Sequence, residues 1–111
     1  MPANPILICA PSAELRAQLE QLGVVGYAVI SVDTAPDAIS ALRAQPFDLI
    51  VAEGQAISGA IVRLRDATPK QVPLLVVSPA GDMEARIAFL EAGADDVIGA
   101  GFAARELEAR V

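Results

Sequence analysis

The chain has 111 residues, of which 54% are apolar and 20% charged, and its formal net charge is -6. This length suits one domain with a single core, and the apolar runs are too short or too interrupted to span a bilayer. The acidic balance argues against direct nucleic-acid binding, the lack of histidine excludes histidine-based triads and metal sites, and the single Cys9 excludes an internal disulfide.

Short apolar runs alternate with segments of helical spacing along the chain. Five runs predict strands, at residues 5–9, 26–32, 47–53, 72–77 and 96–98. Five helices are expected between and after them, at residues 13–22, after Thr34, at 58–66, from Asp82 to Ala92, and at 102–111. Thr34, Pro36 and Asp37 together resemble a helix start with a capping box. The alternation predicts an α/β domain, a doubly wound five-stranded parallel sheet with helices on both faces.

The run from Phe47 to Glu53 is apolar without alternation, which is typical of a central parallel strand covered on both faces. In such sheets the functional residues lie beyond the carboxyl ends of the strands. Glu53 ends this strand, so it is the first candidate for a functional residue.

The helix that ends near Ala92 has apolar residues at helical spacing. Met83, Ile87 and Leu90 predict a stripe that faces the core, and Phe89 lies outside it, which favours an exposed contact surface. The last helix has no stop signal, so we expect the chain to be the N-terminal part of a longer protein. The start of the chain has no basic segment followed by an apolar run, so we expect no signal peptide and a cytoplasmic location.

Several segments, in this order and spacing, resemble the receiver domain of bacterial two-component response regulators. They are Ile6-Leu7-Ile8 with Glu14-Leu15-Arg16, Phe47 to Val51, Pro73 to Ser78, Gly93 to Asp96, and Phe102 with Arg105 to Val111. The resemblance covers residues 6–111 and implies the flavodoxin-like (βα)5 fold of that family.

The residues that carry the family's phosphorylation chemistry differ in this chain. The resemblance places two magnesium-binding acids where this chain has Ala10 and Pro11, a phosphoacceptor aspartate at Glu53, and a lysine at Ala100. Only the hydroxyl residue after the fourth strand is retained, as Ser78. Phosphoryl transfer needs a metal ion and cationic groups to neutralise developing charge. We therefore expect a receiver that has lost phosphorylation, with no enzymatic activity, metal or cofactor of its own.

Some of these residues have a second interpretation. Glu53 could imitate the phosphorylated state by reaching toward Ser78, or it could be a strand-end acid that points into water. Ser78 followed by Pro79 is ordinary turn chemistry, and Cys9 in an apolar strand is more often inert core than a redox sensor. Gly99 to Gly101 could approach a phosphate through the backbone, but a flexible turn with a trans Ala100-Gly101 bond is the interpretation we favour.

Charges of alternating sign surround the fourth helix, the fifth strand and the fifth helix. With Phe89 they form a possible homodimer face, made of Arg86, Phe89, Glu91, Asp95, Asp96, Arg105 and Arg110, with Glu106 nearby. Alternatively, they are solvated surface charges that stabilise little. The expected function is that of an atypical receiver that acts by protein contact or dimerisation, without binding nucleic acid or membrane. Two alternatives remain open: a small-ligand sensor that uses the vacated pocket near Ala10, Glu53, Ser78 and Gly99, and an unusual acceptor phosphorylated on Glu53.

Overall fold

Five parallel strands form one sheet, whose order is β2-β1-β3-β4-β5. The computed structural model describes residues 4–20, 28–57, 59–78 and 83–99. The strands are β1 (Ile6–Cys9), β2 (Val29–Val32), β3 (Leu49–Glu53), β4 (Leu74–Ser78) and β5 (Asp96–Gly99). The predicted α/β class and five-stranded parallel sheet are therefore confirmed. The predicted last helix, at 102–111, lies outside the described residues.

The third strand lies at the centre of the sheet because it pairs with both β1 and β4. Ile50 and Val51 are fully buried in this strand, as expected for a run without polar alternation. The register pairs Cys9 with Ala52, Glu53 with Val77, and Ser78 with Gly99. The carboxyl ends of the central strands therefore meet at one edge, and Glu53 lies at that edge.

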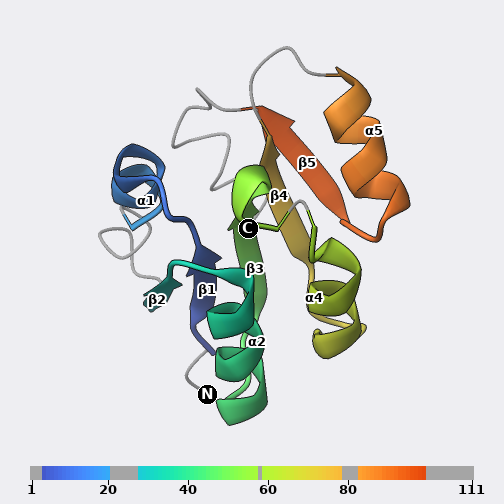
Figure 1. Cartoon of the computed structure of the whole chain (residues 1–111). Helices are drawn as coiled ribbons and strands as arrows, with labels where there is room; N and C mark the ends of the chain where they lie inside the picture. Colours follow the sequence, from blue (N-terminus) through green and yellow to red (C-terminus); the bar gives the residue numbers. More distant parts are fainter. Residues whose placement is uncertain (1–3, 21–27, 58, 79–82, 100–111) are drawn as a thin grey trace.

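Side-chain alternation along the strands divides the core into two layers. The first layer contains Leu7, Cys9, Ile50, Leu74 and Val76 of the sheet, and the second contains Ile6, Ile8, Leu49, Val51 and Val77. Residues of α2 (Ala35–Ala44), α3 (Gly54–Ile57) and α4 (Ile61–Ala67) bury their apolar side chains in the first layer. In Figure 1, α2 and α4 lie side by side over the sheet, and α1 (Ala13–Glu20) lies apart from them near the β2 edge.

The start of α2 has the cap that the sequence predicts. The Thr34 side chain accepts a hydrogen bond of 3.2 Å from the Asp37 amide, and Pro36 occupies the first turn, where its missing N–H costs nothing. The next predicted helix, residues 58–66, differs from the structure, because α3 precedes it and α4 begins only at Ile61. No helix in the described ranges is long and apolar enough to cross a bilayer.

The fourth predicted helix is α5 (Met83–Glu91), and its orientation differs from the prediction. Met83, Ile87 and Leu90 are 64%, 48% and 46% exposed, whereas Phe89 packs against the first core layer. The predicted inward stripe is therefore wrong, and so is the outward placement of Phe89. The physical reason is that Gly54 has no side chain: a Cβ there would lie 2.9 Å from Cε2 and Cζ of the Phe89 ring, so glycine leaves the space that the ring fills.

Candidate functional site at the carboxyl edge of the sheet

Glu53 is half-buried at the end of β3, and its carboxylate contacts the loop that follows β1. Its Oε1 atom accepts a hydrogen bond of 3.1 Å from the backbone N–H of Ser12. The carboxylate is therefore held on the β1 side of the strand. A strand-end acid that simply points into water is not what the structure shows.

Arg16 of α1 holds the same loop from its other side. Its Nε atom donates a hydrogen bond of 3.0 Å to the carbonyl oxygen of Ala10, and its guanidinium forms an ion pair with Asp33, which follows β2. The loop between β1 and α1 is thus held by one acidic and one basic side chain. Ala10 itself is fully buried, and Pro11 is exposed.

Ser78 and Gly99 are neighbours at the ends of β4 and β5, where the register pairs them. Ser78 is only 1% exposed and belongs to the strand itself. Residues 79–82, which include the predicted turn after it, lie outside the described part. Alternation along the paired strands places Ser78 on the side of Val76 and Glu53 on the side of Val77. The sheet thus directs the two side chains to opposite faces, which disfavours the expectation that Glu53 reaches toward Ser78.

Cys9 lies under this edge as part of the buried core. Burial is the main cause that raises the pKa of its thiol to about 11, with smaller contributions from the negative charges of Asp37 and Glu53. The thiol therefore stays protonated near neutral pH, and a thiol without thiolate character reacts slowly with oxidants and electrophiles. This supports the interpretation of Cys9 as core.

The side chains at this edge do not fit a magnesium ion. Magnesium requires several oxygen ligands in near-octahedral order. Ala10 and Pro11 offer no side-chain oxygen, the Glu53 carboxylate already accepts a hydrogen bond, and Asp33 is paired with a guanidinium. Among the described residues, no three acidic or cysteine side chains come together as a group that could hold a metal ion.

The predicted contact face is only partly free for contacts with another molecule. Arg86 donates a hydrogen bond of 3.2 Å to the Val97 carbonyl, and Asp96 accepts one from the Val97 amide. Asp95 is bound within the chain, at 2.8 Å from Arg65 and 2.7 Å from the Leu74 amide. Glu91 is exposed. The exposed side of α5 is instead made by Met83, Ile87 and Leu90.

The predicted lysine position and the part of the predicted contact face at residues 105–110, Glu106 included, fall outside the part of the chain that the structure describes. Ala100, Arg105 and Arg110 lie outside the described residues, as does the Ala100-Gly101 bond that was expected to be trans. The predicted contact face is therefore described only for its α5 and β5 portion.

Sequence reasoning missed the pair formed by Arg16 and Asp33. Asp33 directly follows a strand, so the rule that pointed to Glu53 could have identified it as well. Nothing in the local sequence indicates its partner, because the two residues meet only when α1 packs beside β2.

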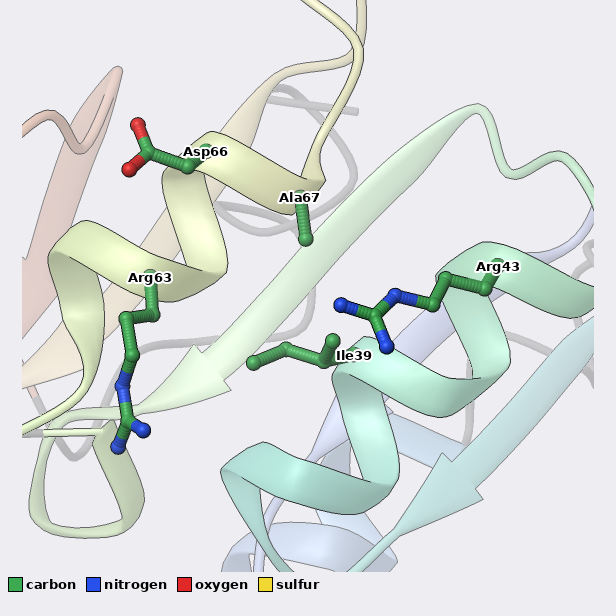
Figure 2. Close-up of a pocket in the computed structure, with 5 residues that line it drawn as sticks. All are labelled: Ile39, Arg43, Arg63, Asp66 and Ala67. Atoms are coloured by element: carbon green, nitrogen blue, oxygen red, sulfur yellow. The ribbon is translucent and has the colours of Figure 1, made fainter.

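A second feature that sequence reasoning missed is a groove between α2 and α4. A cavity of about 440 Å³ is lined by Ile39, Arg43, Arg63, Asp66 and Ala67, and an adjoining one of about 250 Å³ shares the first three of these residues. Figure 2 shows Ile39 and Arg43 extending from α2 into the space between the helices. This groove lies on the side of the first core layer, away from the loop that Glu53 contacts.

The fold is the flavodoxin-like fold of response-regulator receiver domains, and solved structures of such domains superpose on the chain. A Chloroflexus aurantiacus protein described as a response regulator superposes with a TM-score of 0.87 at 26% identity, over 98% of this chain and 94% of that protein. The magnesium-bound receiver domain of a Pseudomonas aeruginosa sensor histidine kinase superposes with a TM-score of 0.83 over the same shares of the two chains. At 21% identity, this second likeness shows the fold alone.

Curated relatives are similar over 96–100% of the chain. The protein named "Probable transcriptional regulator ycf27" from Porphyridium aerugineum is 32% identical over 100% of this chain. The chain spans 48% of that protein, about half the length of the curated relatives that it matches. No protein-family model matches the chain.

Proposed function

We propose that this chain is a receiver domain of two-component signalling that acts by protein contact and not by phosphorylation. The observation that carries the proposal is the hydrogen bond of 3.1 Å between Glu53 Oε1 and the Ser12 amide. It ties the side chain at the phosphoacceptor position to the loop in which the resemblance places the metal ligands.

The chemistry of the neighbouring residues supports this proposal. Ala10 and Pro11 provide no carboxylate, so the negative charge that develops during phosphoryl transfer would lack a metal ion to neutralise it. The glutamate side chain is also one methylene longer than aspartate, and a misplacement of about 1 Å can cost on the order of 100-fold in rate. Both effects disfavour transfer to Glu53.

The contact surface that we propose is the exposed side of α5 together with β5. Met83, Ile87 and Leu90 are partly exposed there, and Glu91 lies beside them. Exposed apolar stripes with charged borders are typical of protein-binding surfaces. The partner is a second copy or another cytoplasmic regulator, and the name of the curated relatives supports a role in the control of transcription. The domain has no catalytic activity of its own.

The decisive experiment exposes the chain to acetyl phosphate and magnesium and measures its intact mass. We expect no phosphoryl adduct. The matched control carries Ala10→Asp, Pro11→Asp, Glu53→Asp and Ala100→Lys, which restores the family's residues, and this variant should gain an adduct if it folds with the same circular dichroism spectrum. A magnesium-dependent adduct on Glu53 of the unmodified chain would contradict the proposal and would favour an unusual acceptor.

A further inference from the structure

The groove between α2 and α4 carries positive charge on a chain whose net charge is negative. Arg43 and Arg63 are exposed, and neither forms an ion pair with another of the described residues. Asp66 lines the same groove, but its carboxylate points away from both guanidinium groups in Figure 2. The two arginines are therefore available to bind carboxylates of another molecule.

The floor of the groove is apolar and open. Ile39, Ala60 and Ala67 are half-buried there, and Ala35 is buried at the end nearest the carboxyl edge of the sheet. Because the two cavities share Ile39, Arg43 and Arg63, they form one continuous groove along the two helices. An apolar floor bordered by guanidinium groups suits an amphipathic helix that carries carboxylates beside an apolar stripe.

The helix α5 has the complementary pattern. Its exposed stripe consists of Met83, Ile87 and Leu90. Glu84 and Glu91 are exposed, and their spacing of seven residues puts both on the same border of the stripe, about 10 Å apart along the axis. On the opposite border, Arg86 is held by the Val97 carbonyl. The helix therefore presents an apolar stripe with an acidic border.

We propose that α5 of one molecule docks in the α2–α4 groove of a second copy of this chain. Its stripe covers Ile39, and its two glutamates pair with Arg43 and Arg63. The inference rests on the proposed function, since it names the surface that receives α5. Because the two surfaces differ, the contact is head-to-tail, and successive copies form a ring or a chain instead of a two-fold dimer. One helix in an open groove buries little area, so the association is weak and transient.

Sedimentation velocity of the full chain over a wide concentration range, up to millimolar, tests this proposal. We expect self-association that weakens by about tenfold or more in Arg43→Glu/Arg63→Glu and in Glu84→Arg/Glu91→Arg, since each variant places like charges in contact. An equimolar mixture of the two variants should associate again. Both variants keep a net negative charge, so recovery in the mixture cannot come from overall attraction.

The matched control is Glu14→Arg/Glu20→Arg on the exposed side of α1, which changes the net charge as much as the α5 variant does. It should associate like the unmodified chain. Thermal unfolding of every variant shows whether it is folded. Equal weakening by this control, or a chain that stays monomeric at the highest concentration, would overturn the proposal.

The same measurement separates this inference from the proposed function. Self-association could be unchanged in Arg43→Glu/Arg63→Glu but lost in Ile87→Asp. This result would keep the α5 surface as a contact face and would refute the groove as the site that receives it. NMR could show that poly-L-glutamate binds in the groove while sedimentation shows that self-association does not depend on the two arginines. This pair of results would refute the proposal and assign the groove to a different acidic partner. The phosphorylation assay is independent of all these outcomes.

Discussion

At the scale of single residues, Glu53 determines what this edge of the sheet can do. Its carboxylate accepts a hydrogen bond from the Ser12 amide, while Arg16 donates one to the Ala10 carbonyl in the same loop. Hydrogen bonds to charged groups contribute more than neutral ones, about 1.5–3 kcal/mol each. The side chains of Glu53 and Arg16 thus hold the loop after β1 in place.

The buried Cys9 thiol, another single residue, predicts that the stability of the chain depends on pH. Its pKa is raised from an ordinary value of 9.0 to about 11, mainly by burial. As the pH rises above 9, the unfolded thiol loses its proton while the native thiol keeps it, so the native state becomes less favoured until the native pKa is passed. The contribution of Cys9 is complete below pH 9 and falls by on the order of 2 kcal/mol by pH 11.

Urea denaturation of the native chain and of Cys9→Ala checks this expectation. The variant should be less stable at pH 8, because it loses buried volume, and the difference should shrink between pH 9 and 11. Equal dependence on pH in both proteins would show that Cys9 does not titrate as expected.

At the scale of elements, the contact between Gly54 and Phe89 sets the orientation of α5. Phe89 fills the space over Gly54, just after Glu53 in the chain, so the opposite side of α5 is left exposed. The end of α5 is fixed by Gly93, whose φ of 124° is a conformation that other residues rarely adopt. The contact between Phe89 and Gly54 therefore positions α5, which carries the proposed contact surface, beside the end of β3.

The substitution Gly54→Ala tests this contact. A Cβ atom at this position would lie 2.9 Å from the Phe89 ring and 3.3 Å from the Val77 carbonyl oxygen, so the ring must move. We expect a loss of about 1–3 kcal/mol in the free energy of unfolding, as for other overpacked cores. The loss should be smaller in a Phe89→Leu background.

Gly59→Ala is the matched control, because a Cβ atom at Gly59 meets nothing within 4 Å. It should leave stability unchanged or raise it by a few tenths of a kcal/mol. Equal effects of the two substitutions in chemical denaturation would remove the steric explanation.

At the scale of the whole molecule, the sheet order brings three strand ends together around one position. Because β3 lies between β1 and β4, the side chain at Glu53 is flanked by the loop after β1 and by the end of β4. This is the place where the sheet could hold a ligand. The residues there offer a hydrogen-bonded carboxylate, a buried serine and an arginine paired with an aspartate.

Magnesium should therefore not stabilise the folded chain. A ligand that binds only the native state at 100 times its dissociation constant adds about 2.7 kcal/mol, which raises the midpoint of thermal unfolding by several degrees. We expect no shift in millimolar magnesium chloride relative to sodium chloride of equal ionic strength. The variant Ala10→Asp/Pro11→Asp/Glu53→Asp, the matched control, should gain a shift. A rise in the native chain would show that Glu53 and its surroundings bind the ion after all.

The local sequence was sufficient to predict the strands, their parallel arrangement and the α2 cap at Thr34. Apolar runs without alternation have to be buried on both faces, and a threonine at the N-cap accepts a hydrogen bond from one of the free amides at a helix start. Glu53 was predicted at a strand end for the same local reason. These features depend on residues that are close together in the chain.

Only the tertiary structure decided which side of α5 packs against the core, what Glu53 contacts and where Arg43 and Arg63 meet across the groove. The helix α5 carries apolar side chains on both sides, so periodicity alone cannot choose between Phe89 and the stripe of Met83, Ile87 and Leu90. The choice was made by Gly54, which is 35 residues away in the sequence and leaves room for one aromatic ring. Packing between distant segments decides such cases, because the energy of a contact depends on both partners and each segment contains only one of them.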